Sequence, residues 1–227
     1  MFILNAIIKQ KNSDFQMPSQ IEIKKFDFLR TLALESGAVD AKIIPANKVV
    51  VEDRVVLKCK VGCSNYGKTL ACPPYTPTPE EFRKIVNEYS YALFMKFESK
   101  AAADPELSKH LSKPETDSTI SENVKKKLRR FWAAWKAAKL EMLSTVHNLE
   151  KAAMSKGYPL AVGLISGHCQ LCEKCTLDRA TCIYPTRYRF SEDAVGVNVQ
   201  ATAKNSGIKA KFPFNKNPAS FALVLID

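Results

Sequence analysis

Seven cysteines in two short groups constrain this chain more than any other feature of its sequence. The first group has the spacing C-x3-C-x8-C and the second has C-x2-C-x2-C-x6-C. The groups consist of Cys59, Cys63 and Cys72, and of Cys169, Cys172, Cys175 and Cys182. Thiols this close together are typical either of disulfide frameworks or of metal sites, and the cell compartment decides between the two.

The start of the chain predicts a cytoplasmic protein. Met1–Ile8 is apolar, but it lacks the basic leading stretch and the small-residue cleavage pattern of a signal peptide. No apolar run approaches the roughly 18 residues that span a bilayer, so no membrane association is expected. Cytoplasmic thiols are kept reduced, and seven is an odd number, so we interpret the cysteines as metal ligands rather than disulfides.

The spacing of the second group favours an iron–sulfur cluster. Cysteines at every third residue let one short loop direct successive sulfurs onto a single small cluster, as in bacterial ferredoxins. Cys182 is close enough in sequence to supply the fourth ligand. Zinc is the alternative, although it more often takes two C-x2-C pairs separated by a dozen or more residues.

The first group offers only three thiolates. Gly62 and Gly67 allow a tight loop, and Pro73 stiffens it beside Cys72. Either a fourth ligand comes from elsewhere, with His168 as one candidate, or one iron keeps an open coordination position that can bind a substrate. The plain alternative is three reduced cysteines buried in a turn.

Basic residues suggest a negatively charged partner. The net charge is +11, which attracts nucleic acid or acidic proteins. Arg187 and Arg189 either neutralise a cluster or an anionic substrate, or form a solvated basic loop. A basic block at 125–130 lies beside Phe131 and Trp135, whose apolar spacing favours core packing over stacking on nucleic acid. An acidic redox partner is therefore favoured over nucleic acid.

Hydrophobic periodicity and capping residues predict helices alternating with short strands. The predicted helices cover residues 26–37, 78–89, 119–156 and 191–207. The predicted strands cover residues 41–44, 49–51, 55–57, 91–97, 160–165 and 221–226. The long third helix would measure about 55 Å at 1.5 Å per residue, so it must bend or protrude near Lys125.

Short strands that are apolar on both faces predict an α/β fold with a mixed, largely parallel sheet covered by helices. Each cysteine group then follows a strand, so the two metal-binding loops share one edge of the sheet. We expect an N-terminal extension at 1–20 and a single α/β metal-binding domain at 21–227. A polar segment at about 99–118 is predicted to be a mobile insertion.

Paired motifs resemble those of a known family. Cys59–Cys63, Cys72-Pro73-Pro74-Tyr75 and Thr78-Pro79-Glu80-Glu81 are similar to its first signature, and Gly167–Cys182 followed by Arg189 is similar to its second. The family is the prokaryotic predicted metal-binding protein family, domain of unknown function 2284. The resemblance implies metal or iron–sulfur binding by all seven cysteines and implies no particular activity. Phe190 stands where the family pattern has proline.

Three functions follow as hypotheses. The first is electron transfer through two 4Fe-4S clusters, one held by four cysteines and one by three. The second is an enzyme that uses the open iron of the three-cysteine cluster as a Lewis acid or as a donor of electrons or sulfur. The third is a zinc-binding module that contacts nucleic acid or protein. No catalytic Ser/His/Asp arrangement, phosphate loop or nucleotide fingerprint is present, which disfavours a hydrolytic or nucleotide-driven enzyme.

Overall fold

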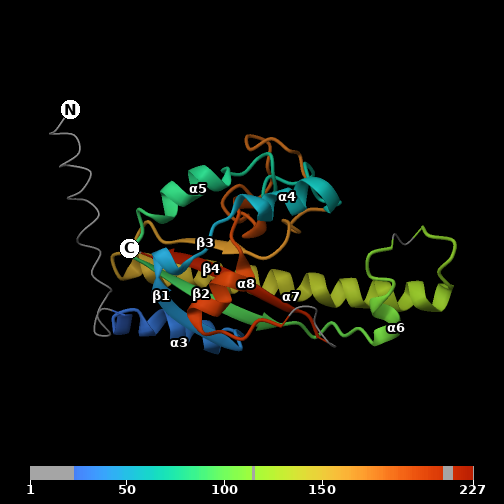
Figure 1. Ribbon diagram of the computed structural model, residues 1–227, viewed down its shortest axis with the longest axis horizontal. Helices are drawn as coiled ribbons and strands as arrows, with labels where there is room; N and C mark the ends of the chain where they lie inside the picture. The colour runs from blue at the N-terminus through green and yellow to red at the C-terminus, as the bar shows by residue number, and fades with distance from the viewer. Residues whose placement is uncertain (1–22, 114–115, 212–216, 227) are drawn as a thin grey trace.

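A four-stranded sheet forms the centre of the protein. The computed structural model describes residues 23–113, 116–211 and 217–226, so the predicted extension at 1–20 lies outside the described residues. The strands lie in the order β1-β2-β4-β3 (Figure 1). Their bounds are Asp40–Pro45 for β1, Tyr91–Glu98 for β2, Val162–Ile165 for β3 and Ala219–Ile226 for β4.

Every neighbouring pair of strands in this sheet is antiparallel. The prediction of a largely parallel sheet was therefore wrong. Its premise was that strands apolar on both faces belong to parallel sheets, but helices on both sides bury an antiparallel sheet equally well. This changes where the cysteine groups start. Because β1 and β3 run in opposite directions, the C-terminal end of β1 lies at one end of the strands and that of β3 lies at the other, on opposite edges of the sheet.

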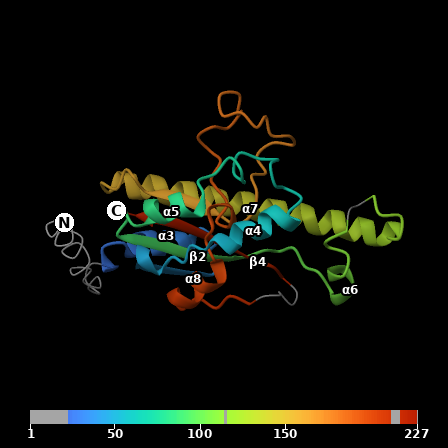
Figure 2. The same cartoon turned by 45° about the horizontal axis from the view of Figure 1, so that its top comes forward.

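Helices cover both faces of the sheet. On one face, α3 (Asp27–Glu35) and α7 (Glu122–Ser155) bury Leu93 and Met95 of β2. On the other, α5 (Pro79–Val86) and α8 (Val199–Ser206) bury Ala92 and Phe94 of the same strand. Alternate residues of a strand point to opposite faces, so both sets of β2 side chains are buried. The result is three layers, with helices, sheet and helices in turn (Figures 1 and 2).

Helix α7 is longer than the sheet that it covers. Its 34 residues extend about 51 Å at 1.5 Å per residue, and its N-terminal part projects past the strands (Figure 1). The protruding end that the sequence predicted is confirmed. Leu128 and Phe131 on this projection are buried together with Leu107 of α6 (Pro105–Ser108) and Ile120. The basic block is partly paired, since Lys125 lies 3.0 Å from Glu122.

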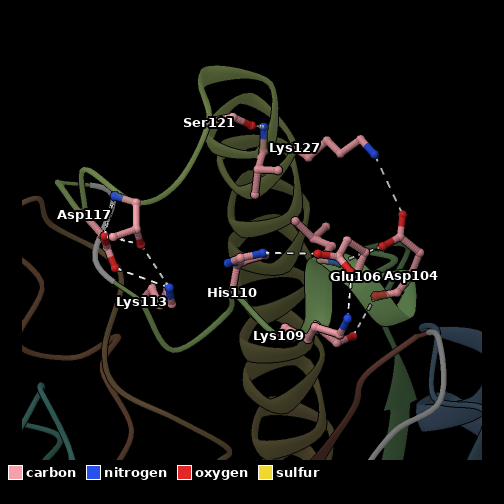
Figure 3. A network of polar contacts seen from close by, with 12 residues as sticks. Asp104, Glu106, Lys109, His110, Lys113, Asp117, Ser121 and Lys127 are labelled. Carbon is pink, nitrogen blue, oxygen red and sulfur yellow. Dashed lines mark hydrogen bonds and ion pairs between the residues drawn. The ribbon is translucent and has the colours of Figure 1, made fainter.

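The segment at 99–118 supplies this small second core. Asp104 caps α6 by accepting a hydrogen bond from the main chain of Leu107 at 2.6 Å, and Lys127 of α7 lies 3.9 Å from the same carboxylate (Figure 3). Part of the segment is therefore folded onto α7, while its mobility stays a prediction.

Three elements differ from the sequence prediction. The residues predicted as a strand at 49–51 form none, and Val51 makes only an isolated bridge to Val197. The residues predicted as a strand at 55–57 belong to helix α4 (Asp53–Gly62). Only Val56 and Cys59 of α4 are buried, one helical turn apart, so packing overrides the strand preference of the valines. The predicted helix at 191–207 is divided at Gly196, whose φ of +87° ends the short 3-10 helix η2 (Asp193–Val195) before α8 begins.

Several local signals are confirmed. Thr78 and Glu81 form the expected capping box at the start of α5, and Gly207 ends α8 with a φ of +75°. Within the part of the chain that the structure describes, no helix is both long and apolar enough to cross a membrane.

Candidate metal centre

The first cysteine group begins in a helix rather than after a strand. Cys59 lies in the last turn of α4, Cys63 directly follows that helix, and Cys72 lies in the turns beyond it. Cys59 and Cys72 are buried, whereas Cys63 is exposed. The expectation that this group follows a strand is thus wrong. Helical geometry separates Cys59 from Cys63 by about one turn, which brings the two thiols to the same side of the chain.

The second group lies in the irregular segment between β3 and η2, as predicted from the sequence. Its four thiols are all partly exposed. Of the described residues 167–178, none forms a hydrogen bond between main-chain groups. The main-chain NH of Leu171 bonds the Cys169 thiol, and the other NH groups of this stretch have no main-chain acceptor. We refer to residues 166–190 as the four-cysteine loop.

The two cysteine groups lie side by side despite starting from opposite edges of the sheet. After β1 the chain returns along the sheet, where Val51 bridges to Val197, and α4 follows. The main chain of Ser191 then donates to Ala71, next to Cys72, at 3.0 Å, while Glu192 donates to Ile165 at the end of β3 at 3.0 Å. The first group and the four-cysteine loop are thus joined through one short segment (Figures 1 and 2).

The thiols of the two groups are close enough to raise one another's pKa. The pKa of Cys59 is raised to about 11, chiefly by burial and also by Asp193, Cys63 and Cys72, while Lys58 opposes the increase. Burial also raises the pKa of Cys72, and the thiols of Cys63 and Cys169 raise it further. The coupling of Cys72 with Cys169 links the two groups.

Within the second group the same pattern holds. Burial raises the pKa of Cys169, and the thiols of Cys172, Cys175 and Cys182 add to the increase. All seven cysteines are free thiols. Because a metal ligand must be a thiolate, binding of a metal at either group would have to displace protons.

Among the described residues, no three His, Cys, Asp or Glu side chains converge on a point that one ion could occupy. Four thiolates around one centre suit zinc, and thiolates spread over several irons suit an iron–sulfur cluster. The seven free thiols are therefore a donor set that fits either metal.

Arg189 has a partner that the sequence did not indicate. Its Nε donates to Glu150 of α7 at 2.6 Å, and Nη2 donates to the other oxygen of the same carboxylate. Arg189 therefore anchors the end of the four-cysteine loop to α7 rather than neutralising a cluster or lying in solvent. Arg187 instead lies over the ring of Tyr184, 5.6 Å from its centroid.

His168 is half-buried beside Cys169. Burial lowers its pKa, and the ammonium groups of Lys139 and Lys136 lower it further, so the imidazole is neutral at pH 7. Its role as an extra ligand stays a prediction.

Asp193 and Lys139 are candidate functional residues that sequence reasoning missed. Asp193, in η2, interacts with both Cys59 and Cys72 and forms an ion pair with Lys58 at 3.1 Å. Lys139, in α7, is only 7% exposed, and its Nζ donates to the main chain of Ser166 at 3.0 Å. Neither has a sequence signal, since each is brought to the cysteines only by tertiary contacts.

A cavity of about 1150 Å³ opens beside the four-cysteine loop. Its walls come from α4, the middle of α7, the start of α8 and the loop itself, and all four cysteines of the second group line it. The cavity lies past the C-terminal end of β3, where α7 projects beyond the sheet.

Comparison with known proteins identifies a family of predicted metal-binding proteins. Its family model, DUF2284, matches residues 42–226, which include all seven cysteines. No curated protein and no solved structure matches the chain.

Proposed function

The chain belongs to the DUF2284 family of predicted metal-binding proteins, and from this premise we propose that it is an iron–sulfur protein that transfers electrons through two 4Fe-4S clusters. The observation that carries the proposal is the meeting of two groups of free thiols, one of four and one of three, through the hydrogen bond between Ser191 and Ala71.

The ligands divide between the two groups. Cys169, Cys172, Cys175 and Cys182 would hold one cluster completely. Cys59, Cys63 and Cys72 would hold the other and leave one iron without a thiolate, and Asp193 lies near two of these three cysteines. When bound, such clusters supply reversible one-electron chemistry.

Two properties of the chain support clusters over zinc. Main-chain NH groups in residues 167–178 have no main-chain acceptor, and NH groups stabilise cluster sulfurs. The cation of Lys139 lies beneath the loop, where it would offset the negative charge of a thiolate-bound cluster.

The adjacency of the two groups supports electron transfer. Cys72 and Cys169 belong to different groups and interact electrostatically. Clusters held at these positions would be neighbours, and electron transfer is faster over shorter distances.

Anaerobic purification with a count of iron, sulfide and zinc per chain tests the proposal. Two clusters require about eight irons and one requires about four. Cys172→Ser and Cys63→Ser should each lower the count by about half, because they remove ligands of different clusters. Thr176→Ala is the matched control in the same loop and should leave the count unchanged.

The redox role requires a second measurement. The visible absorbance should bleach when a low-potential reductant is added and return on reoxidation. Stoichiometric zinc without iron, or a folded and colourless protein from iron-replete cells, would refute the proposal.

A further inference from the structure

The cavity beside the four-cysteine loop is larger than a cluster requires. Sites for small organic molecules typically measure roughly 300–1,000 Å³, and this cavity measures about 1150 Å³. It extends from the cysteines along α7 to Trp132 and across to Asn198 at the start of α8. Space therefore remains for an organic ligand beyond the volume next to the thiols.

The walls of the cavity carry an excess of positive charge. Two of the cations are already paired, since Lys58 contacts Asp193 at 3.1 Å and Arg54 contacts Glu52 at 2.6 Å. Glu173 is a further carboxylate in the wall. Four more lysines line the cavity, and within the described residues none of them has a carboxylate in ion-pairing range. These are Lys68, Lys136, Lys139 and Lys174.

Lys139 is the most constrained of the four. Its side chain is buried in the wall, and the carbonyl of Ser166 takes one of its hydrogen bonds at 3.0 Å. An ammonium group has three donors. A buried charge is costly unless it is paired, so an anion in the cavity would satisfy Lys139 at little further desolvation cost.

Aromatic rings lie beside these cations. Trp132 and Trp135 both line the cavity, and Lys139 Nζ lies 4.6 Å from the centroid of the Trp135 ring. Trp135 is itself stacked on Phe131, with ring centroids 6.4 Å apart, which holds it in place. Because Phe131 and Lys139 already cover the Trp135 ring, the exposed indole of Trp132 is the one against which a flat apolar group can pack while its charged end reaches the lysines.

We propose that this cavity binds a small planar organic anion, whose carboxylate or phosphate contacts Lys139 and Lys136 and whose ring packs against Trp132. The site goes beyond electron transfer, because its binding groups come from α7 and need no metal. The bound anion would lie next to the four-cysteine loop, which forms one wall of the cavity.

Calorimetric titration of the full-length, anaerobically purified protein tests the site. Benzoate and phenyl phosphate are the probes, and they distinguish a carboxylate from a phosphate preference. Benzamide, which has the ring without the charge, and inorganic phosphate, which has the charge without the ring, are the controls. At least one charged aromatic probe should bind about tenfold or more tightly than either control.

Two lysine variants test whether the probe binds in the cavity. Lys136→Met is an exposed substitution on α7 and is compatible with folding, while Lys139→Met removes the buried charge. Each should weaken the preferred probe by about tenfold or more, as expected for a lost charge-assisted hydrogen bond. Lys151→Met, also exposed on α7 but away from the cavity, should leave the affinity unchanged.

Tryptophan emission gives an independent readout. The chain has two tryptophans, and both line the cavity, so the bound probe should change the emission of the protein. The site is refuted if the charged probes bind no better than benzamide, or if Lys136→Met and Lys151→Met behave alike. The iron count is measured separately on the same sample, so failure of the cluster proposal is distinguished from failure of the anion site.

Discussion

The guanidinium of Arg189 binds both carboxylate oxygens of Glu150, with Nε 2.6 Å from Oε1. The same carboxylate also accepts a hydrogen bond from the main chain of Gly163 in β3 at 2.7 Å. Glu150 thus joins α7, the edge strand and the end of the four-cysteine loop. Both side chains are largely buried, with 20% and 12% exposure, so the pair is shielded from solvent.

Glu150→Gln should destabilise the fold. The variant leaves Arg189 without its carboxylate partner, with only the carbonyls of Thr186 and Tyr188 as acceptors, and loss of a hydrogen bond between charged groups costs about 1.5–3 kcal/mol. Urea unfolding of the two proteins measures this difference in the free energy of unfolding. Glu141→Gln, at an exposed position of α7, is the control and should stay within about 0.5 kcal/mol of the parent. Equal effects of the two variants would contradict the shielding of the pair.

Gly196→Ala should destabilise the protein more than Gly207→Ala does. Both glycines have a positive φ, +87° and +75°, so both variants carry backbone strain of about 1–2 kcal/mol. A Cβ at Gly196 would also lie 2.8 Å from Pro79, whereas one at Gly207 meets nothing within 4 Å. Overpacking adds about 1–3 kcal/mol at position 196 alone. Thermal unfolding of both variants measures the difference, and similar melting temperatures would contradict it.

Glu192 should make the folded state less stable as the pH rises. Complete burial raises its pKa from 4.5 to about 8, with Asp193 adding to the increase and Ser166 and Lys139 opposing it. Between those pH values the folded state keeps a proton that the unfolded state releases, so the free energy of unfolding falls by up to about 1.4 kcal/mol per pH unit.

Glu192→Gln should remove that contribution. Its slope of unfolding free energy against pH, measured by urea unfolding between pH 5 and 7, should be more positive than that of the parent protein. The comparison of slopes cancels the contributions of groups whose titration the substitution does not change. Lys139, whose pKa burial lowers to about 8, acts in the opposite sense, and it stays mostly protonated below pH 7. Parallel slopes would show that Glu192 is ionised in the folded protein.

Removal of the metal should loosen the four-cysteine loop first. The described residues 167–178 have no hydrogen bonds between main-chain groups to hold their shape, so metal ligation would supply most of their order. Trypsin should cleave at Lys174 and Arg179 faster after treatment with a chelator. Lys151, within α7, is the internal reference and should be cleaved at the same rate in both samples. Unchanged cleavage of the loop would argue against metal binding there.

The sequence predicted the local elements where one residue dominates the local conformation. Thr78 and Glu81 form the capping box from which α5 starts, and Gly207 ends α8 with a left-handed φ. The cysteine motifs were likewise sufficient to indicate the family. Such features depend on residues within a few positions of one another, so they can be predicted from the chain alone.

The β-branched residues of α4 led to a wrong prediction of a strand. Val55 and Val56 belong to α4 rather than to a strand, because only Val56 of the two is buried and the helix buries Cys59 one turn later. The direction of the strands was similarly undetermined. Leu93 and Phe94 of β2 are both buried, and helices on two faces produce that pattern in parallel and antiparallel sheets alike.

The sequence by itself determined which residues are candidate ligands, since seven thiols in two short spacings allow few other uses. Only the tertiary structure decided that the two groups meet, because β1 and β3 end at opposite edges and the chain must return along the sheet before Ala71 reaches Ser191. It also decided that Lys139 and Asp193 lie beside them. The physical reason is that such contacts join residues far apart in the chain, and the packing of helices on both sheet faces, rather than any local preference, brings them together.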